Sequence, residues 1–104
     1  MKKVIDRKCY DTEKARHIAS WCNTPDTGDF RHMEESLYCS PKGQYFIAGS
    51  GGPMSSYARS CGNNETCGSS DICLVTKDEA IDWLESHNMV EELEEEFGNE
   101  LQEG

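Results

Sequence analysis

A turn between two extended stretches constrains the fold of this chain most. The segment SPKG at positions 40–43 places proline at the second and glycine at the fourth position of a β-turn. Residue types alternate along 30–39, and the apolar run 45–48 lies in the return segment 44–49. The sequence therefore predicts an antiparallel hairpin whose first strand is partly exposed and whose second strand is apolar on both faces.

Three other regions supply the remaining β and loop predictions. Residues 3–10 have the pattern of a short hairpin with its turn at 6–8, although that turn lacks the glycine that tight primed turns prefer. Residues 72–75 form an apolar stretch between polar flanks and are expected to be a short buried strand. Five glycines between 49 and 71 predict a loop, interrupted by one helical turn at 55–60.

A first helix is predicted at 12–22. The pair Asp11-Thr12 offers an N-cap before Glu13. An apolar stripe with spacing i, i+3, i+4, i+7 follows, as expected for an amphipathic helix; its members are Ala15, Ile18, Ala19 and Cys22.

Two more helices are predicted in the last quarter of the chain. The segment TKDE at 76–79 is a capping box that begins a helix at 77–87, and Asn88 breaks or bends this helix. An acidic helix is expected at 89–97, with Gly98 as its stop. The packing face of the first helix is Ala80, Trp83, Leu84 and His87 with Ile81 beside them, and the narrow apolar seam of the second is Val90, Leu93, Phe97 and Leu101.

Together these patterns predict an α+β fold in one domain, 1–104. Its small antiparallel sheet of three to five strands packs with two or three helices, and its acidic helical segment covers 77–104. The basic start of the chain is not followed by the apolar region of a signal peptide, and no apolar run approaches the roughly 20 residues that span a bilayer. We therefore expect a cytoplasmic protein.

The charge of the chain is concentrated at its C-terminal end. Residues 77–104 contain eleven of the 20 Asp and Glu residues but one of the ten Lys and Arg residues, so this segment carries the whole formal charge of −10. Such charge disfavours direct binding to nucleic acid or to an anionic membrane and favours a basic protein surface. The alternative is a solvated helix face that only keeps the protein soluble. The expected partner-binding residues are Asp78, Glu79, Asp82, Glu85, Glu91, Glu92, Glu94, Glu95, Glu96 and Glu100.

The six cysteines leave a second interpretation open. Without an export signal, reduced thiols are expected, because cytosolic disulfides are rare. Cys61, Cys67 and Cys73 are spaced six residues apart and lack the close cysteine pairs of structural zinc sites. A zinc-binding or thiol-redox module built on these three is therefore the alternative, and no cofactor is expected. The three histidines lie on different predicted elements without a convincing nucleophile, so the sequence predicts no enzyme.

Several short segments resemble a family of small acidic proteins found on phages and mobile elements of bacteria, mostly without assigned function. They are YDTEKA at 10–15, DF at 29–30, EESLY at 34–38, GQYF at 43–46, GSGGP at 49–53, SYA at 56–58 and KDEAIDW at 77–83. The resemblance places the protein in a bacterial host cell, and small acidic proteins of this genomic type are associated with anti-CRISPR activity. Members of this group often lack the cysteines and carry Gly where Arg7 stands, which argues against a shared metal site.

Charge and resemblance together predict a non-enzymatic inhibitor that binds a basic host nucleoprotein, in particular a CRISPR–Cas effector. The carboxylates would occupy a Lys/Arg groove that otherwise holds DNA, with exposed aromatics such as Tyr38 or Tyr45 as anchors. A third hypothesis is a structural homodimer in which the seam at 90–101 packs against a second copy of itself.

Overall fold

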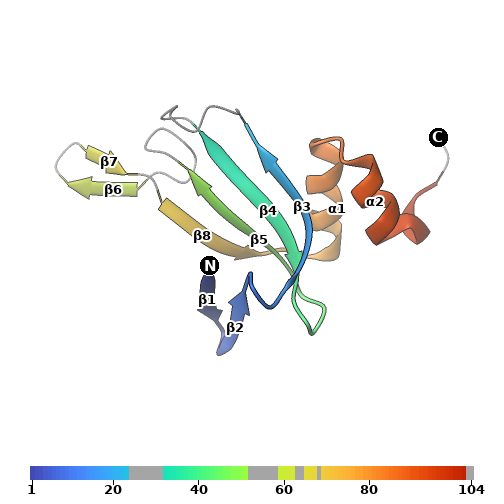
Figure 1. The fold of residues 1–104 in the computed structure, drawn as a ribbon, viewed down its shortest axis with the longest axis horizontal. Helices are drawn as coiled ribbons and strands as arrows, with labels where there is room; N and C mark the ends of the chain where they lie inside the picture. Colours follow the sequence, from blue (N-terminus) through green and yellow to red (C-terminus); the bar gives the residue numbers. More distant parts are fainter. Residues whose placement is uncertain (24–31, 52–58, 63–64, 68, 103–104) are drawn as a thin grey trace.

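The protein was analysed as a computed structural model that describes residues 1–23, 32–51, 59–62, 65–67 and 69–102, with side chains described outside 59–69. Within these described residues, two helices and a short 3-10 turn follow eight strands (Figure 1). The elements are β1 (Lys2–Ile5), β2 (Lys8–Asp11), β3 (Arg16–Cys22), β4 (Met33–Cys39), β5 (Tyr45–Gly51), β6 (Arg59–Gly62), β7 (Glu65–Cys67), β8 (Ser69–Leu74), α1 (Lys77–Ser86), α2 (Val90–Phe97) and η1 (Gly98–Glu100).

The hairpin around residues 40–43 is the centre of the main sheet, as the sequence predicts. Strands β4 and β5 pair antiparallel from Cys39↔Tyr45 outward, within a four-stranded sheet of order β3-β4-β5-β8. The Gly43 amide donates to the Ser40 carbonyl at 2.9 Å, which closes the turn. Gly43 has φ +91°, a left-handed conformation that glycine adopts without strain.

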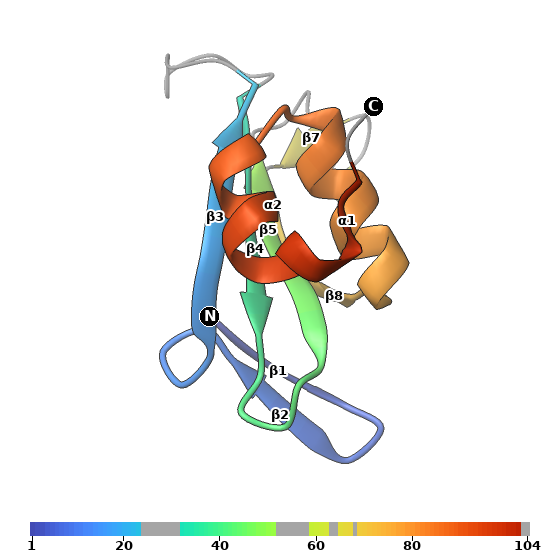
Figure 2. The same ribbon diagram turned by 90° about the vertical axis from the view of Figure 1, so that its right-hand side faces the viewer.

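The apolar run of β5 is buried because both faces of the sheet are covered. Successive side chains of a strand point to opposite faces. Tyr45 and Ile47 pack against the cluster that contains the helix residues, whereas Phe46 and Ala48 belong to a second cluster with Tyr10 of the first hairpin. The two helices cover one face of the sheet (Figure 2), and the β1–β2 hairpin contacts the other. The α+β fold with a small antiparallel sheet is confirmed.

The predicted helix at 12–22 is wrong, because this segment contains β3. Residues 12–15 form a turn in which the Asp11 carbonyl accepts the Lys14 and Ala15 amides, and Asp11 Oδ1 accepts the Glu13 amide. From Arg16 the chain is extended and pairs antiparallel with β4. Asp11 therefore caps a tight turn rather than a helix.

A β-bulge explains why the sequence of β3 resembles a helix. The register with β4 shifts between His17 and Ala19, so the usual alternation of a strand is interrupted at Ile18. Both Ile18 and Ala19 then pack against the helix-side cluster, although they are consecutive. Two adjacent apolar residues that share one face match the i+3 and i+4 positions of a helical stripe, and they conceal the period of two of a strand.

The other β predictions are confirmed in part. The first hairpin forms, with Asp6 at φ 51° and Arg7 at φ 66° in a tight turn that contains no glycine. The strand expected at 72–75 begins earlier, at Ser69, and ends at Leu74. Strands β6 and β7 pair with each other where a loop was expected. Of the helical turn predicted at 55–60, residues 59 and 60 belong to β6 and the others lie outside the described residues.

The two C-terminal helices contact each other and pack on the same face of the sheet. Helix α1 ends one residue before the predicted limit, and Asn88 follows with φ 53°, so the chain changes direction there as expected. Helix α2 ends at Phe97, before Gly98. Within the described residues, no helix combines the length and apolarity that a membrane span requires.

Candidate functional site

The candidate site is the outer surface of α1 and α2. A capping box fixes where α1 begins. The Glu79 amide donates to Thr76 Oγ1 at 3.1 Å, and the Thr76 amide donates to Glu79 Oε1 at 3.0 Å, which confirms the capping box. Ala80 and Leu84 are buried against the sheet. Positions that are four and three residues apart share one helix face. The exposed stripe of α1 is Asp78, Asp82 and Glu85.

Aromatic stacking fixes the end of α1 against the sheet. The His87 ring stacks on Trp21 of β3 with centroids 4.2 Å apart, and the Trp83 ring meets His87 edge-on at 4.8 Å. Trp83 also donates its Nε1 hydrogen to Glu35 Oε1 at 3.4 Å. Helix α1 therefore has one packed face and one charged face.

The apolar seam of α2 is used within the molecule. Leu93 and Phe97 are buried in the helix-side cluster, while Val90 is 52% and Leu101 38% exposed. The two central seam residues are thus enclosed by the protein's own sheet. These two residues are not available to a second copy, whereas Val90 and Leu101 of the predicted seam remain exposed, and the homodimer stays a prediction.

Glu96 is the one glutamate of α2 that turns toward the sheet. Arg16 donates two hydrogen bonds to it, Nη1 to Oε1 at 2.5 Å and Nη2 to Oε2 at 2.7 Å. The Tyr45 hydroxyl donates to Oε2 at 3.1 Å. The Glu96 side chain is 13% exposed. We call this three-residue arrangement the Glu96 clamp.

The Glu96 clamp shifts the acidity of its members in the directions that its geometry requires. The hydrogen bonds from Arg16 lower the pKa of Glu96 below its ordinary value, against the opposing effect of burial. The same bonds raise the pKa of Arg16. Burial, and then the hydrogen bond to Glu96, raise the pKa of Tyr45 to about 12. Glu96 is therefore an ionised internal anchor at neutral pH.

The ten predicted partner-binding acids divide into two groups. Glu79 belongs to the capping box, Glu96 to the clamp, and Glu100 accepts a hydrogen bond from Lys77. The remaining seven form no ion pair with any described residue, and we call them the acidic surface; they are Asp78, Asp82, Glu85, Glu91, Glu92, Glu94 and Glu95.

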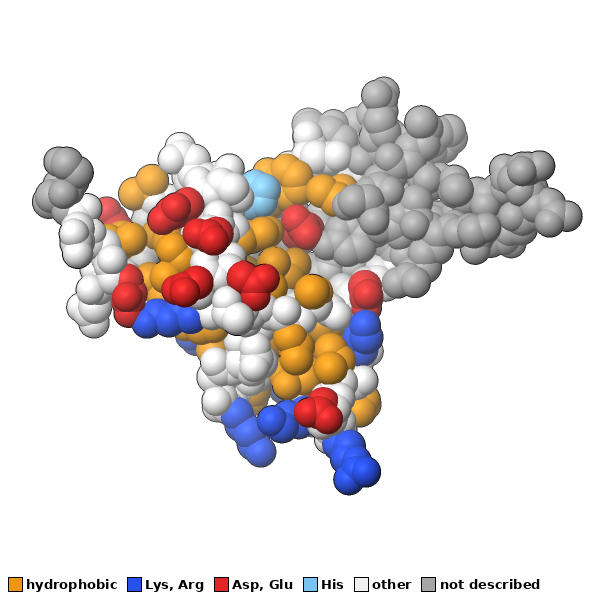
Figure 3. Space-filling view, turned by 180° about the vertical axis from the view of Figure 1, so that it is seen from behind, with side chains coloured by type: hydrophobic (Ala, Val, Ile, Leu, Met, Phe, Trp, Pro, Cys, Tyr) orange, Lys and Arg blue, Asp and Glu red, His pale blue; other side chains and the backbone are white. Residues whose placement is uncertain are grey.

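Figure 3 shows Asp and Glu side chains gathered over the helical end of the molecule. Several Lys and Arg side chains lie at the bottom of this view, and one group of basic side chains borders the acids of the helical end. Acidic side chains are therefore concentrated at the helical end in space as well as in sequence. A positively charged partner would meet the helical end first, because opposite charges attract over roughly a Debye length, about 8 Å at physiological salt.

Sequence reasoning missed Arg16 and Tyr45 as members of the clamp. The sequence predicts a helix at 12–22 in which Arg16 lies off the apolar stripe, whereas the structure has a strand that brings Arg16 to α2. Tyr45 was expected as an exposed anchor together with Tyr38, but both are half-buried. Tyr38 stacks on Phe46 with centroids 5.4 Å apart. The alternation of β5 is the signal that would have placed Tyr45 on the helix side.

The cysteine hypothesis falls largely outside the described side chains. Cys73 is an exposed free thiol on β8, whereas Cys61 in β6 and Cys67 in β7 have no described side chains. Among the described side chains, no three Cys, His, Asp or Glu groups are close enough to hold a metal ion.

One histidine does have a hydroxyl neighbour, which the sequence did not indicate. His17 Nε2 lies 2.7 Å from Ser20 Oγ, which is 2.9 Å from Ser36 Oγ. Activation of a serine nucleophile also needs a group that orients the second ring nitrogen. Among the described residues, no carboxylate bonds to His17, whose ring instead meets Tyr38 edge-on. The arrangement links β3 to β4 and supports no catalytic assignment.

Comparison of the chain with protein-family models, with curated proteins and with solved structures found no match.

Proposed function

We propose that this protein is a non-enzymatic inhibitor whose acidic surface binds a basic nucleoprotein in the bacterial cytoplasm. The observation that carries the proposal is the group of seven carboxylates on two adjacent helices that lack ion-pair partners within the described residues. Mutual repulsion of like charges on a helix costs a few tenths of a kcal/mol per pair. A basic partner would relieve this repulsion on binding.

The proposed mechanism is occlusion of a nucleic-acid groove. Residues on a helix rise about 1.5 Å each, so charges three or four residues apart on α1 are separated by about 5–6 Å along its axis. This interval is longer than the roughly 3.4 Å of axis per phosphate of one DNA strand, so the carboxylates would occupy only part of the phosphate positions in a groove. Helix α2 lies beside α1 and adds a second row. The two rows would compete with DNA for the same Lys and Arg side chains.

The resemblance to phage and mobile-element proteins selects a CRISPR–Cas effector as the partner to test first. Such effectors hold nucleic acid in a positively charged channel. Binding there would prevent recognition of target DNA without any catalytic step by the inhibitor. The Glu96 clamp would hold α2 in place against the sheet, so the acidic surface would bind as a preformed unit.

The decisive experiment compares two charge-reversed variants. In the first, Glu91→Lys and Glu94→Lys alter the acidic surface; in the control, Glu13→Lys and Glu34→Lys make the same change in net charge at exposed positions elsewhere. Each tagged protein is used to capture partners from bacterial lysate, and purified guide-loaded Cas effectors are then tested for DNA binding in its presence.

We expect the first variant to lose partner affinity about tenfold or more, and the control to retain it. Circular dichroism establishes that both variants keep the wild-type fold. Equal binding by both variants would refute the role of the acidic surface. Binding that DNA does not compete with would refute occlusion while leaving a protein-binding role.

A further inference from the structure

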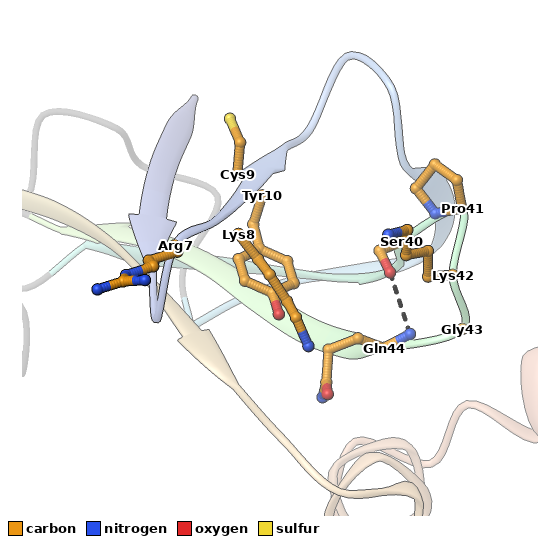
Figure 4. Close-up of a pocket in the computed structure, with 9 residues that line it drawn as sticks. All are labelled: Arg7, Lys8, Cys9, Tyr10, Ser40, Pro41, Lys42, Gly43 and Gln44. Carbon is orange, nitrogen blue, oxygen red and sulfur yellow. Dashed lines mark hydrogen bonds between the residues drawn. The ribbon is translucent and has the colours of Figure 1, made fainter.

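A hollow lies at the basic end of the molecule, away from the acidic surface. It is formed by residues 7–10 of the first hairpin and residues 40–44 around the turn that joins β4 to β5 (Figure 4). Its volume is about 540 Å³. Binding sites for small molecules have volumes of about 300–1,000 Å³. The hollow is therefore large enough for a small ligand and is formed by two segments that are distant in sequence.

The charge of the hollow is of one sign. Arg7, Lys8 and Lys42 line it, and its described lining contains no carboxylate. In Figure 4 the Arg7 side chain extends away from the other labelled side chains, which leaves the two lysines as the central cations. An ammonium group acts as a compact point charge and donates up to three hydrogen bonds. This chemistry suits the several oxygens of a tetrahedral oxyanion better than it suits the planar fork of a carboxylate.

Tyr10 adds a hydroxyl group to the lining of the hollow. Its side chain is 6% exposed and is held edge-on to Phe46, with centroids 5.7 Å apart. Its hydroxyl forms no hydrogen bond with any described residue, although it belongs to a side chain that lines the hollow. The hydroxyl oxygen is not among the buried polar atoms that lack a partner in the described part of the chain, so it is accessible from the hollow. A ligand oxygen in the hollow would accept a hydrogen bond from it.

The first hairpin places Lys8 and Tyr10 together. They are two residues apart on β2, so their side chains leave the strand on the same face. Figure 4 shows the Lys8 amine and the Tyr10 hydroxyl directed toward the side of the hollow where Gln44 lies. One ammonium donor and one hydroxyl donor thus come from one strand, while Lys42 belongs to the turn segment that lines the hollow with them.

We propose that this hollow binds the phosphoryl group of a small phosphorylated molecule, with Lys8, Lys42 and the Tyr10 hydroxyl as its donors. The site is independent of the acidic surface and of its proposed partner. The helices lie beside the sheet and the first hairpin lies below it (Figure 1), and salt screens charges that are more than about 8 Å apart. The net negative charge of the chain therefore does not exclude an anion from this site.

The test is a titration of the full chain with inorganic pyrophosphate, followed by amide chemical shifts in ¹H–¹⁵N NMR spectra. Citrate is titrated in parallel as a carboxylate anion of similar charge. The variants are Lys8→Gln, Lys42→Gln and Tyr10→Phe, the last of which removes one hydroxyl and keeps the ring against Phe46. Lys14→Gln is the matched control, because Lys14 is an exposed cation near the hairpin that does not line this hollow.

We expect saturable shifts from pyrophosphate, confined to residues 7–10 and 40–44. Each lysine variant should weaken binding about tenfold and Tyr10→Phe about three- to tenfold, with less than a twofold effect of Lys14→Gln. Absence of saturation up to about 10 mM would overturn the site. Equal weakening by Lys14→Gln would also overturn it, since binding would then depend on general charge. Tighter binding of citrate would overturn the assignment to a phosphoryl group.

Discussion

Glu96 differs from the other glutamates of α2 in what surrounds it. Its neighbours Glu94 and Glu95 are exposed, whereas Glu96 accepts three hydrogen bonds from Arg16 and Tyr45. The residue type and the local sequence are the same, so the difference comes entirely from which side of the helix faces the sheet. Each residue of a helix is rotated by about 100° from the one before it, so Glu95 faces solvent and the next residue, Glu96, faces the sheet.

We predict that Glu96→Gln lowers the free energy of unfolding by about 1–2 kcal/mol at pH 7, because it weakens the charge-assisted bonds of the clamp. The folded pKa of Glu96 is lowered, so its contribution is complete above the ordinary Glu value of about 4.3 and is lost as the pH falls through the folded value. The gap between wild type and variant should therefore close in acid.

Urea unfolding at a series of pH values measures this gap. Glu95→Gln is the control, since Glu95 is exposed and outside the clamp; it should change stability by less than about 0.5 kcal/mol. A Glu96→Gln gap that stays constant down to pH 2 would show that the ionised carboxylate is not what stabilises the clamp.

At the scale of elements, the sequence predicts correctly those elements that are stabilised by hydrogen bonds between residues close together in the chain. The capping box at the start of α1 satisfies two amides through contacts three residues apart, and the turn at 40–43 is closed by one backbone bond. Strand β3 is different, because its seven residues are extended only through pairing with β4. Its partner β4 begins at Met33, and the pairing of two strands cannot be recognised from the residues of one strand alone.

We predict that Thr76→Ala destabilises the protein by about 1 kcal/mol, since it removes the side-chain acceptor of the Glu79 amide. Thr76→Ser should retain most of the stability because serine supplies the same oxygen. Thermal unfolding followed by circular dichroism at 222 nm compares the three proteins. Equal losses for alanine and serine would refute the capping contribution and would instead indicate a role for the threonine methyl group.

At the scale of the whole molecule, the main feature is the separation of unpaired acids from bases. Helices α1 and α2 contact each other and carry the seven carboxylates of the acidic surface. Their mutual repulsion is long-ranged and is reduced by salt. The described ion pairs, such as Lys3–Asp71 at 2.6 Å, are also screened, but they are fewer.

We predict that raising NaCl from about 0.01 to 0.2 M increases the melting temperature by about 2–5 °C, because screening relieves the repulsion on the acidic surface. Replacing Glu91, Glu94 and Glu95 with glutamine should raise stability at low salt and flatten the dependence on NaCl. A melting temperature that falls with salt in the wild type would mean that the ion pairs outweigh the unpaired acids.

The sequence by itself determined the elements whose causes are local. These are the hairpin at 40–43, the first hairpin, the capping box and the break at Asn88, each of which depends on turn chemistry or on bonds between near neighbours. It also determined that the acids are clustered, because charge in a sequence does not depend on the fold.

Tertiary structure decided what each clustered residue does. It made 16–22 a bulged edge strand, turned Glu96 inward onto Arg16, and enclosed Leu93 and Phe97 that had been candidates for a dimer seam. It also joined β2 to the turn after β4, which created a basic hollow that no sequence spacing indicates. These outcomes depend on contacts between distant segments, and a pattern read over ten or fifteen residues contains no information about such contacts.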